Sequence, residues 1–61
     1  MQITKKEFTR LVSRFGLDAH TEPRVEVDGP YLYECFDTPD GDEVAFITWF
    51  DGAPSYHAVQ F

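Results

Sequence analysis

The most reactive side chains in this sequence are one cysteine, Cys35, and two histidines, His20 and His57. A cysteine nucleophile needs a base within hydrogen-bond reach, because the thiol must lose its proton before it attacks. The strand pairing predicted below places Cys35 and His57 on opposite faces of a sheet, and His20 falls in a linker. We therefore expect no catalytic residue and no enzymatic activity, with Cys35 a small, buried or half-buried core residue.

Four carboxylates crowd the tip of one predicted hairpin, and they are Asp37, Asp40, Asp42 and Glu43. Their spacing lacks the alternating aspartates of a calcium loop, and the Asp40-Gly41 pair is typical of a turn. One cysteine and two distant histidines also fall short of a structural zinc site. We expect no metal and no cofactor, and we interpret these carboxylates as a solvated acidic rim. A weak divalent-ion site is the alternative.

The chain has 61 residues and a net charge of −6, and this charge is unevenly distributed. Four of the five basic residues lie near the N-terminus, and they are Lys5, Lys6, Arg10 and Arg14. The remainder is strongly acidic and repels phosphate backbones, which disfavours nucleic acid as the partner. The basic residues then either solvate a helix face or serve a nucleic-acid accessory protein.

No apolar run approaches the roughly 18 residues of a membrane span. The N-terminal segment also lacks the apolar region of a signal peptide. A single cysteine cannot form an internal disulfide. These features predict a cytoplasmic protein with no membrane association.

The first segment carries signals for both ends of a helix. Thr4 and Glu7 have the spacing of a capping box, and Ile3 and Phe8 have that of a hydrophobic staple around it. Gly16 can adopt the left-handed conformation that ends a helix. Between these signals an apolar stripe recurs at helical spacing, formed by Phe8, Leu11, Val12 and Phe15. The spacing predicts a helix over about 4–15.

Turn signals recur about every ten residues after a polar linker at 17–23. The β-rich segments between these turns are 24–28, 31–37, 43–50 and 55–61. Short loops favour antiparallel hairpins over crossover connections. The predicted fold class is α+β, with one N-terminal helix packed on a four-stranded antiparallel β-meander (α-β-β-β-β). The single domain spans 1–61.

Turn geometry also predicts a register for this sheet. The expected cross-strand pairs include Val27–Tyr31, Tyr31–Trp49, Tyr33–Ile47 and Trp49–Tyr56. Strand alternation then places nearly all phenylalanines on one face and every tyrosine and the tryptophan on the other. Because Phe has no polar atom, whereas Tyr and Trp tolerate a half-wet surface, we expect the helix on the phenylalanine face. Alternatively, the helix packs against Cys35, Ala45 and Ala58 on the Tyr/Trp face.

An exposed sheet face rich in Tyr, Trp and β-branched residues is larger than the apolar patches that monomers usually leave open. Such aromatic residues are also enriched at the centres of protein interfaces. We therefore expect a non-enzymatic protein-interaction module, of the kind often encoded by phages and mobile elements, that binds or inhibits a host protein. The expected partner-binding residues are Val25, Val27, Tyr31, Tyr33, Ile47, Trp49 and Tyr56.

Two alternatives from other classes stay open at this point. One is a nucleic-acid accessory protein that binds phosphates through the basic helix face. The other is a homodimer in which the leftover sheet face is only the seam between two copies.

Overall fold

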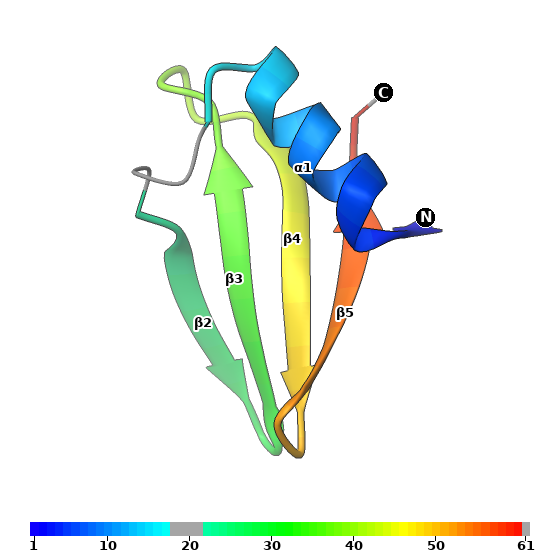
Figure 1. Ribbon diagram of the computed structural model, residues 1–61. Helices are drawn as coiled ribbons and strands as arrows, with labels where there is room; N and C mark the ends of the chain where they lie inside the picture. Colours follow the sequence, from blue (N-terminus) through cyan, green and yellow to red (C-terminus); the bar gives the residue numbers. More distant parts are fainter. Residues whose placement is uncertain (18–21, 61) are drawn as a thin grey trace.

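The computed structural model describes residues 1–17 and 22–60. Within these ranges the elements are β1 (Gln2–Ile3), α1 (Lys5–Arg14), β2 (Arg24–Asp28), β3 (Tyr31–Asp37), β4 (Glu43–Phe50) and β5 (Ala53–Ala58). All strand pairs are antiparallel, and the strand order is β1-β5-β4-β3-β2. Helix α1 lies across the upper part of one sheet face, against β4 and β5 (Figure 1). The predicted α+β class is confirmed.

Helix α1 begins at the predicted capping box. The backbone N–H of Glu7 donates to the Thr4 hydroxyl at 3.1 Å, and the Thr4 N–H donates to the Glu7 carboxylate at 3.0 Å. Each bond satisfies a donor that the first turn of a helix would otherwise leave unpaired. The bonds with Thr4 also lower the pKa of Glu7, because they favour the charged carboxylate.

The end of α1 follows a Schellman motif. Gly16 has a φ of 76°, its N–H donates to the Ser13 carbonyl at 3.0 Å, and the Leu17 N–H donates to the Val12 carbonyl at 2.8 Å. Glycine suits this position because the left-handed conformation strains residues that carry a Cβ. Leu17, expected at the start of a polar linker, is instead a buried core residue. The expected linker residue His20 and the terminal Phe61 lie outside the described residues.

The sheet has five strands in the described residues rather than four, because the N-terminus adds a short edge strand to β5. The Met1 and Ala58 backbones exchange two hydrogen bonds, of 2.8 and 3.0 Å. This pairing depends on the docking of α1, which brings the chain start beside β5. A two-residue strand has no periodicity of its own, so the sequence pattern did not predict it.

The hairpin between β3 and β4 has the predicted loop but a different register. Thr38 and Asp42 close the loop, since the Thr38 N–H donates to the Asp42 carbonyl at 2.8 Å. Asp37 then pairs with Glu43 as expected, but the next pair joins Phe36 to Ala45 and leaves Val44 unpaired. Val44 is therefore the extra residue of a β-bulge. Relative to β4, the side chains of β3 therefore lie on the opposite face of the sheet from the one that the predicted register gives them.

The other two hairpins have two-residue turns. Gly29-Pro30 pairs Asp28 with Tyr31, which shifts β2 by one residue from the predicted register. Asp51-Gly52, with φ angles of 51° and 78°, pairs Phe50 with Ala53. Positive φ at both central residues defines the hairpin turn that matches strand twist. The β4–β5 register differs from the prediction by two residues, so the face of each side chain is unchanged.

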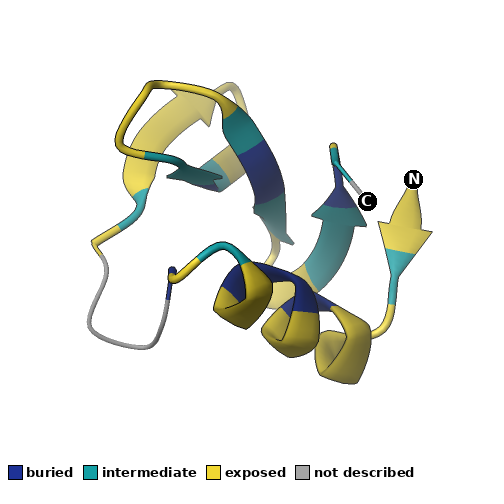
Figure 2. Cartoon of the chain, turned by 90° about the horizontal axis from the view of Figure 1, so that it is seen from above, coloured by how far each residue is buried: buried dark blue, intermediate teal, exposed yellow. Residues whose placement is uncertain are grey.

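The core lies between α1 and the face of the sheet that carries Ala45, Ile47, Tyr56 and Ala58 (Figure 2). Its buried members are Phe8, Leu11, Val12, Leu17, Val44, Ala45 and Ala58. The expectation that Phe46 and Phe50 lie beneath the helix is wrong. The small alanines allow the helix to approach the sheet closely, as the alternative prediction proposes, but Cys35, which that prediction also places beneath the helix, lies on the opposite face.

No helix in the described part of the chain is long and apolar enough to cross a membrane.

Candidate functional site

The sheet face opposite α1 carries no further layer within the described residues (Figure 2). We call this surface the open face, and its aromatic residues are Tyr31, Tyr33, Phe46, Phe50 and His57. Cross-strand pairing places them together, because Tyr31 pairs with Phe50 and Phe46 pairs with His57. Side chains of paired residues lie on the same side of a sheet. The open face therefore presents aromatic rings from three neighbouring strands.

These rings form a continuous series of contacts. Ring centroids of Tyr31 and Phe50 are 5.0 Å apart, and those of Tyr31 and Tyr33 are 6.3 Å apart. The series continues from Tyr33 to Phe46 at 6.2 Å. Phe46 stacks on the imidazole of His57 at 4.7 Å with an interplanar angle of 11°. Such contacts hold each ring in place, so the rings together form a preorganised apolar surface.

The two outermost rings are well exposed. Tyr31 is 40% exposed and Phe50 is 50% exposed, whereas Tyr33, Phe46 and His57 are half-buried by their neighbours. A Phe side chain with half of its surface in water leaves apolar area that burial in an interface would stabilise. The Tyr31–Phe50 pair is thus the most accessible part of the open face.

A charged network borders the rings at the end of the open face near the β3–β4 hairpin. Arg24 donates from Nε to the Asp37 carboxylate at 2.9 Å and from Nη1 to Glu26 at 2.7 Å. Its Nη2 donates to Glu43 at 3.2 Å. The hydrogen bond with Asp37 raises the pKa of Arg24, so the guanidinium stays charged. The pairs are partly solvated and each contributes little to stability.

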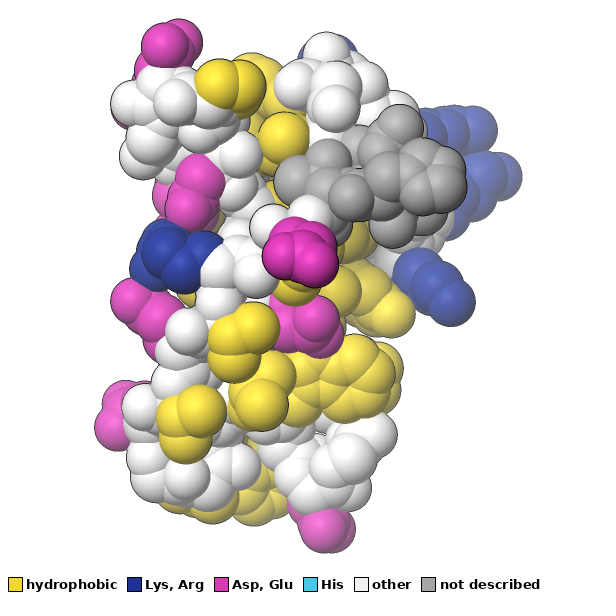
Figure 3. Space-filling model, turned by 90° about the vertical axis from the view of Figure 1, so that its left-hand side faces the viewer, with side chains coloured by type: hydrophobic (Ala, Val, Ile, Leu, Met, Phe, Trp, Pro, Cys, Tyr) yellow, Lys and Arg dark blue, Asp and Glu magenta, His cyan; other side chains and the backbone are white. Residues whose placement is uncertain are grey.

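The open face is acidic and α1 is basic. One guanidinium, Arg24, stands on the open face against four carboxylates, which are Glu26, Asp28, Asp37 and Glu43. Figure 3 shows most Lys and Arg side chains on the side of α1, whereas Asp and Glu side chains surround the basic group on the other side. The two sides of the molecule therefore carry charge of opposite sign.

Two of the seven expected partner-binding residues, Tyr31 and Tyr33, lie on the open face. The other five lie on the helix side, and they are Val25, Val27, Ile47, Trp49 and Tyr56. The predicted single cluster of Tyr31, Tyr33, Trp49 and Tyr56 is therefore wrong. The cause is the bulge at Val44, which shifts the register between β3 and β4 by one residue. The tyrosines of β3 therefore lie on the opposite face of the sheet from Trp49.

The five helix-side residues have different surroundings. Ile47 and Tyr56 pack against the core, and the Tyr56 ring lies 5.2 Å from that of Phe8. The indole N–H of Trp49 donates to the Glu34 carboxylate. Val25 and Val27 are largely exposed. Only this last pair retains the solvent access that a docking residue needs.

The expected acidic rim divides into two parts. Asp37 and Glu43 pair with Arg24, so part of their charge is neutralised. Asp40 and Asp42 are exposed on the β3–β4 loop, where the Thr38 hydroxyl accepts a hydrogen bond from the Asp42 N–H at 3.1 Å. Among the four carboxylates of the expected rim, Asp40 and Asp42 are thus the two that do not pair with Arg24.

Sequence reasoning missed Phe46, Phe50 and His57 as surface residues of the open face. Strand alternation correctly grouped them on one face of β4 and β5, but that face was assigned to the helix because phenylalanine is apolar. The signal that distinguishes the faces was the pair of alanines, Ala45 and Ala58, since a closely packed helix needs small residues beneath it.

Cys35 and His57 share the open face, which corrects the expectation that they lie on opposite faces. Phe46 separates them, because it pairs with Cys35 on one side and His57 on the other. Two strand spacings amount to about 10 Å, which is beyond hydrogen-bond reach. Burial raises the pKa of the Cys35 thiol, although nearby Arg24 partly opposes this. The arrangement therefore supplies no activated thiolate.

His57 makes the stability of this protein depend on pH. Burial, with a smaller effect of the N-terminal ammonium, lowers the pKa of His57 from its ordinary value of 6.5. The unfolded chain then binds the proton more readily, so stability is lost as pH falls through 6.5. We expect chemical or thermal unfolding between about pH 7.5 and pH 5 to show this loss.

The variant His57→Phe is the matched control, since it keeps an aromatic ring against Phe46 but cannot titrate. The difference in unfolding free energy between the two proteins should change with pH, whereas carboxylate effects common to both cancel. Parallel pH profiles, or an NMR titration that gives His57 a pKa above 6.5, would contradict the prediction.

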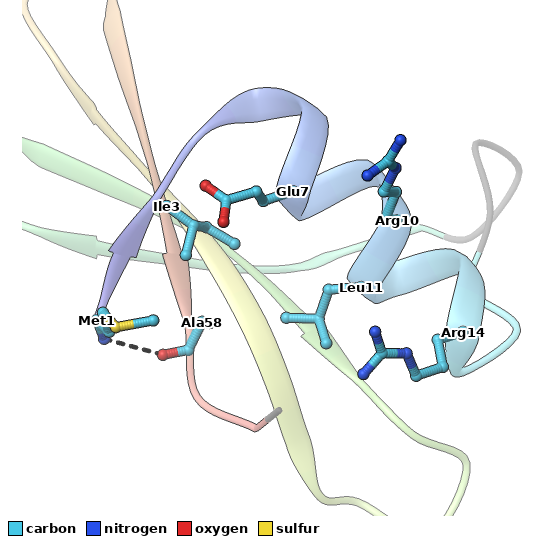
Figure 4. A pocket seen from close by; sticks show the side chains of 7 residues that line it. All are labelled: Met1, Ile3, Glu7, Arg10, Leu11, Arg14 and Ala58. Carbon is cyan, nitrogen blue, oxygen red and sulfur yellow. Dashed lines mark hydrogen bonds between the residues drawn. The ribbon is translucent and has the colours of Figure 1, made fainter.

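A groove of about 260 Å³ lies between α1 and the strands β1 and β5 (Figure 4). Its described lining residues are Met1, Ile3, Glu7, Arg10, Leu11, Arg14 and Ala58. Arg14 projects from α1 beside the apolar side chain of Leu11, and Glu7 extends toward Ile3. Glu7 is already hydrogen-bonded to the helix cap, so this lining contains no paired acid and base for catalysis.

Among residues 1–17 and 22–60, no group of three or more His, Cys, Asp or Glu side chains is arranged to hold a metal ion. Comparisons with protein-family models, curated proteins and solved structures found no match to this chain.

Proposed function

We propose that this chain is a non-enzymatic protein-interaction module that binds a basic or mixed protein surface through its open face. The observation that carries the proposal is the aromatic series from Tyr31 and Phe50 to His57, on a sheet face without a covering layer in the described residues. Aromatic residues at the centre of a surface with a polar rim are typical of interface hot spots.

The charges around the series support a choice of partner. Carboxylates at the border of the open face repel nucleic acid and attract Lys- or Arg-rich protein surfaces. A basic surface of this kind commonly serves another polyanion. A bound copy of this protein would then inhibit its partner by covering that surface, which is the binder or inhibitor role that the composition first suggested.

The proposal predicts that Phe50→Ala strongly weakens capture of the partner. The protein, immobilised as bait, is exposed to a lysate of its source cells, and the retained proteins are compared with those of two variants. Loss of an exposed aromatic ring that the partner buries costs about 2 kcal/mol or more, which weakens binding at least about 30-fold. A partner of the expected kind is basic, is retained by the native chain, and elutes as salt increases.

The matched control changes Lys5, Lys6, Arg10 and Arg14 to Gln on the opposite side of the molecule. This variant should retain the partner, because α1 does not contribute to the open face. Capture that survives Phe50→Ala but is lost in the four-Gln variant would contradict the proposal. If the captured material were then nucleic acid, it would favour the accessory protein.

A further inference from the structure

Strand β2 forms one edge of the sheet, and all five of its residues are exposed. Figure 3 looks onto this edge and shows hydrophobic side chains between charged ones. On the helix side of the strand, Val25 is 56% exposed and Val27 is 71% exposed. An exposed edge strand can pair with a strand of another chain.

The backbone groups of Val25 and Val27 point away from the sheet. Gly29-Pro30 is a two-residue turn, so Asp28 and Tyr31 form the hydrogen-bonded pair that closes this hairpin. Hydrogen-bonded and non-hydrogen-bonded pairs alternate along an antiparallel ladder. Every second residue of β2, beginning with Asp28, therefore forms backbone hydrogen bonds with β3. The N–H and C=O groups of both valines are therefore directed outward to an incoming strand.

The side chains of β2 are complementary to those of a second copy of β2 that runs antiparallel to it. In an antiparallel register centred on Glu26, Arg24 of each copy faces Asp28 of the other. The same register sets Val25 of each copy opposite Val27 of the other. Opposite charges and β-branched pairs across strands both stabilise pairing. The unfavourable Glu26–Glu26 contact is offset because Arg24 of the same chain lies 2.7 Å from Glu26.

This register also aligns the outward backbone groups. Two Val25–Val27 pairs give four backbone hydrogen bonds, whereas a register centred on either valine gives only two. We propose that a second copy of this chain pairs with β2 in the register centred on Glu26 and joins the two sheets into one.

The proposed dimer has a defined geometry. Side chains of the same face meet across the seam, so the twofold axis is perpendicular to the sheet and both helices lie on one side. The valines of the two copies adjoin there and extend an apolar patch that includes Leu32 and Trp49. Both open faces remain free on the other side, so this inference does not depend on the proposed function.

Sedimentation equilibrium combined with amide hydrogen exchange tests the dimer without any substitution. The average mass should rise with concentration towards twice that of the monomer. The amides of Val25 and Val27 should exchange more slowly as concentration increases. The amide of Gln2, on the opposite edge strand, should show no such change.

Substitutions in β2 provide a second readout. Val27→Pro removes an outward N–H but no bond to β3, and it should weaken the dimer at least about tenfold. Val27→Thr retains both the N–H and the β-branched side chain, and should dimerise as the native protein does. Asp28→Arg sets two arginines against each other at each end of the seam and should also weaken the dimer.

The proposal is overturned by a protein that stays monomeric up to about 1 mM. It is equally overturned by a dimer that neither Val27→Pro nor Asp28→Arg weakens, since such a dimer uses another surface. Protection of the two valine amides only when a different protein is added would assign the edge to that protein and would overturn self-pairing.

Discussion

Replacing Phe8 with Ala is expected to lower the free energy of unfolding by about 3–5 kcal/mol. Phe8 is 6% exposed, and its ring packs against side chains from two strands. Its ring lies 5.3 Å from that of Phe36, edge to face, and 5.2 Å from that of Tyr56. A domain of this size has few other buried groups, so most of the molecules should be unfolded at 25 °C.

Phe50→Ala is the matched control, because it removes the same ring from the open face. Phe50 is 50% exposed and contacts Tyr31 without reaching the core, so we expect a loss of about 1 kcal/mol or less. Urea unfolding followed by circular dichroism measures both variants. Equal losses for the two substitutions would mean that the open face is also a packed core, and would argue against a free binding surface.

Replacing Ala45 with Phe is expected to displace α1 from the sheet and to cost about 1–3 kcal/mol or more. Ala45 is fully buried, and it pairs with Phe36 on one side and with Ala58 on the other. Without a larger side chain at this position, the helix can approach the strands closely. A phenylalanine ring there has no space unless the helix moves away.

The matched control for this substitution is Ala53→Phe, which adds the same ring on the open face. Ala53 is exposed and pairs with Phe50, so the added ring should leave stability nearly unchanged and extend the aromatic surface. Thermal unfolding measures both variants. A destabilising Ala53→Phe combined with a tolerated Ala45→Phe would mean that the helix covers the face that carries Ala53.

The sequence pattern does not predict which aromatic residues of β3 and β4 share a face of the sheet. Alternation correctly predicted that Tyr31 and Tyr33 share one face of β3, and that Trp49 lies on the opposite face of β4 from Phe46 and Phe50. Alternation within a strand is a property of that strand alone. Whether the tyrosines then share a surface with Trp49 or with Phe50 depends on the register between β3 and β4. A shift of one residue in that register exchanges the two outcomes.

Local chemistry by itself determined the helix and the positions of the turns. Thr4, Glu7 and Gly16 satisfy the ends of α1 with bonds to residues within a few positions, so their spacing along the chain was sufficient to predict them. The turns likewise depend on neighbouring residues such as Asp51-Gly52. The α+β class follows from these signals and from the short connections between strands.

Tertiary structure alone decided which sheet face the helix covers and which aromatic residues stay in water. The extra residue, Val44, is accommodated as a bulge because its side chain is fully buried and its carbonyl accepts bonds from Val59 and Gln60 at 2.8 and 3.0 Å. Those partners lie far from Val44 in sequence, so the residues next to Val44 do not predict the bulge. The resulting shift buries Ala45 beneath α1 and leaves Tyr31 beside Phe50 on the open face.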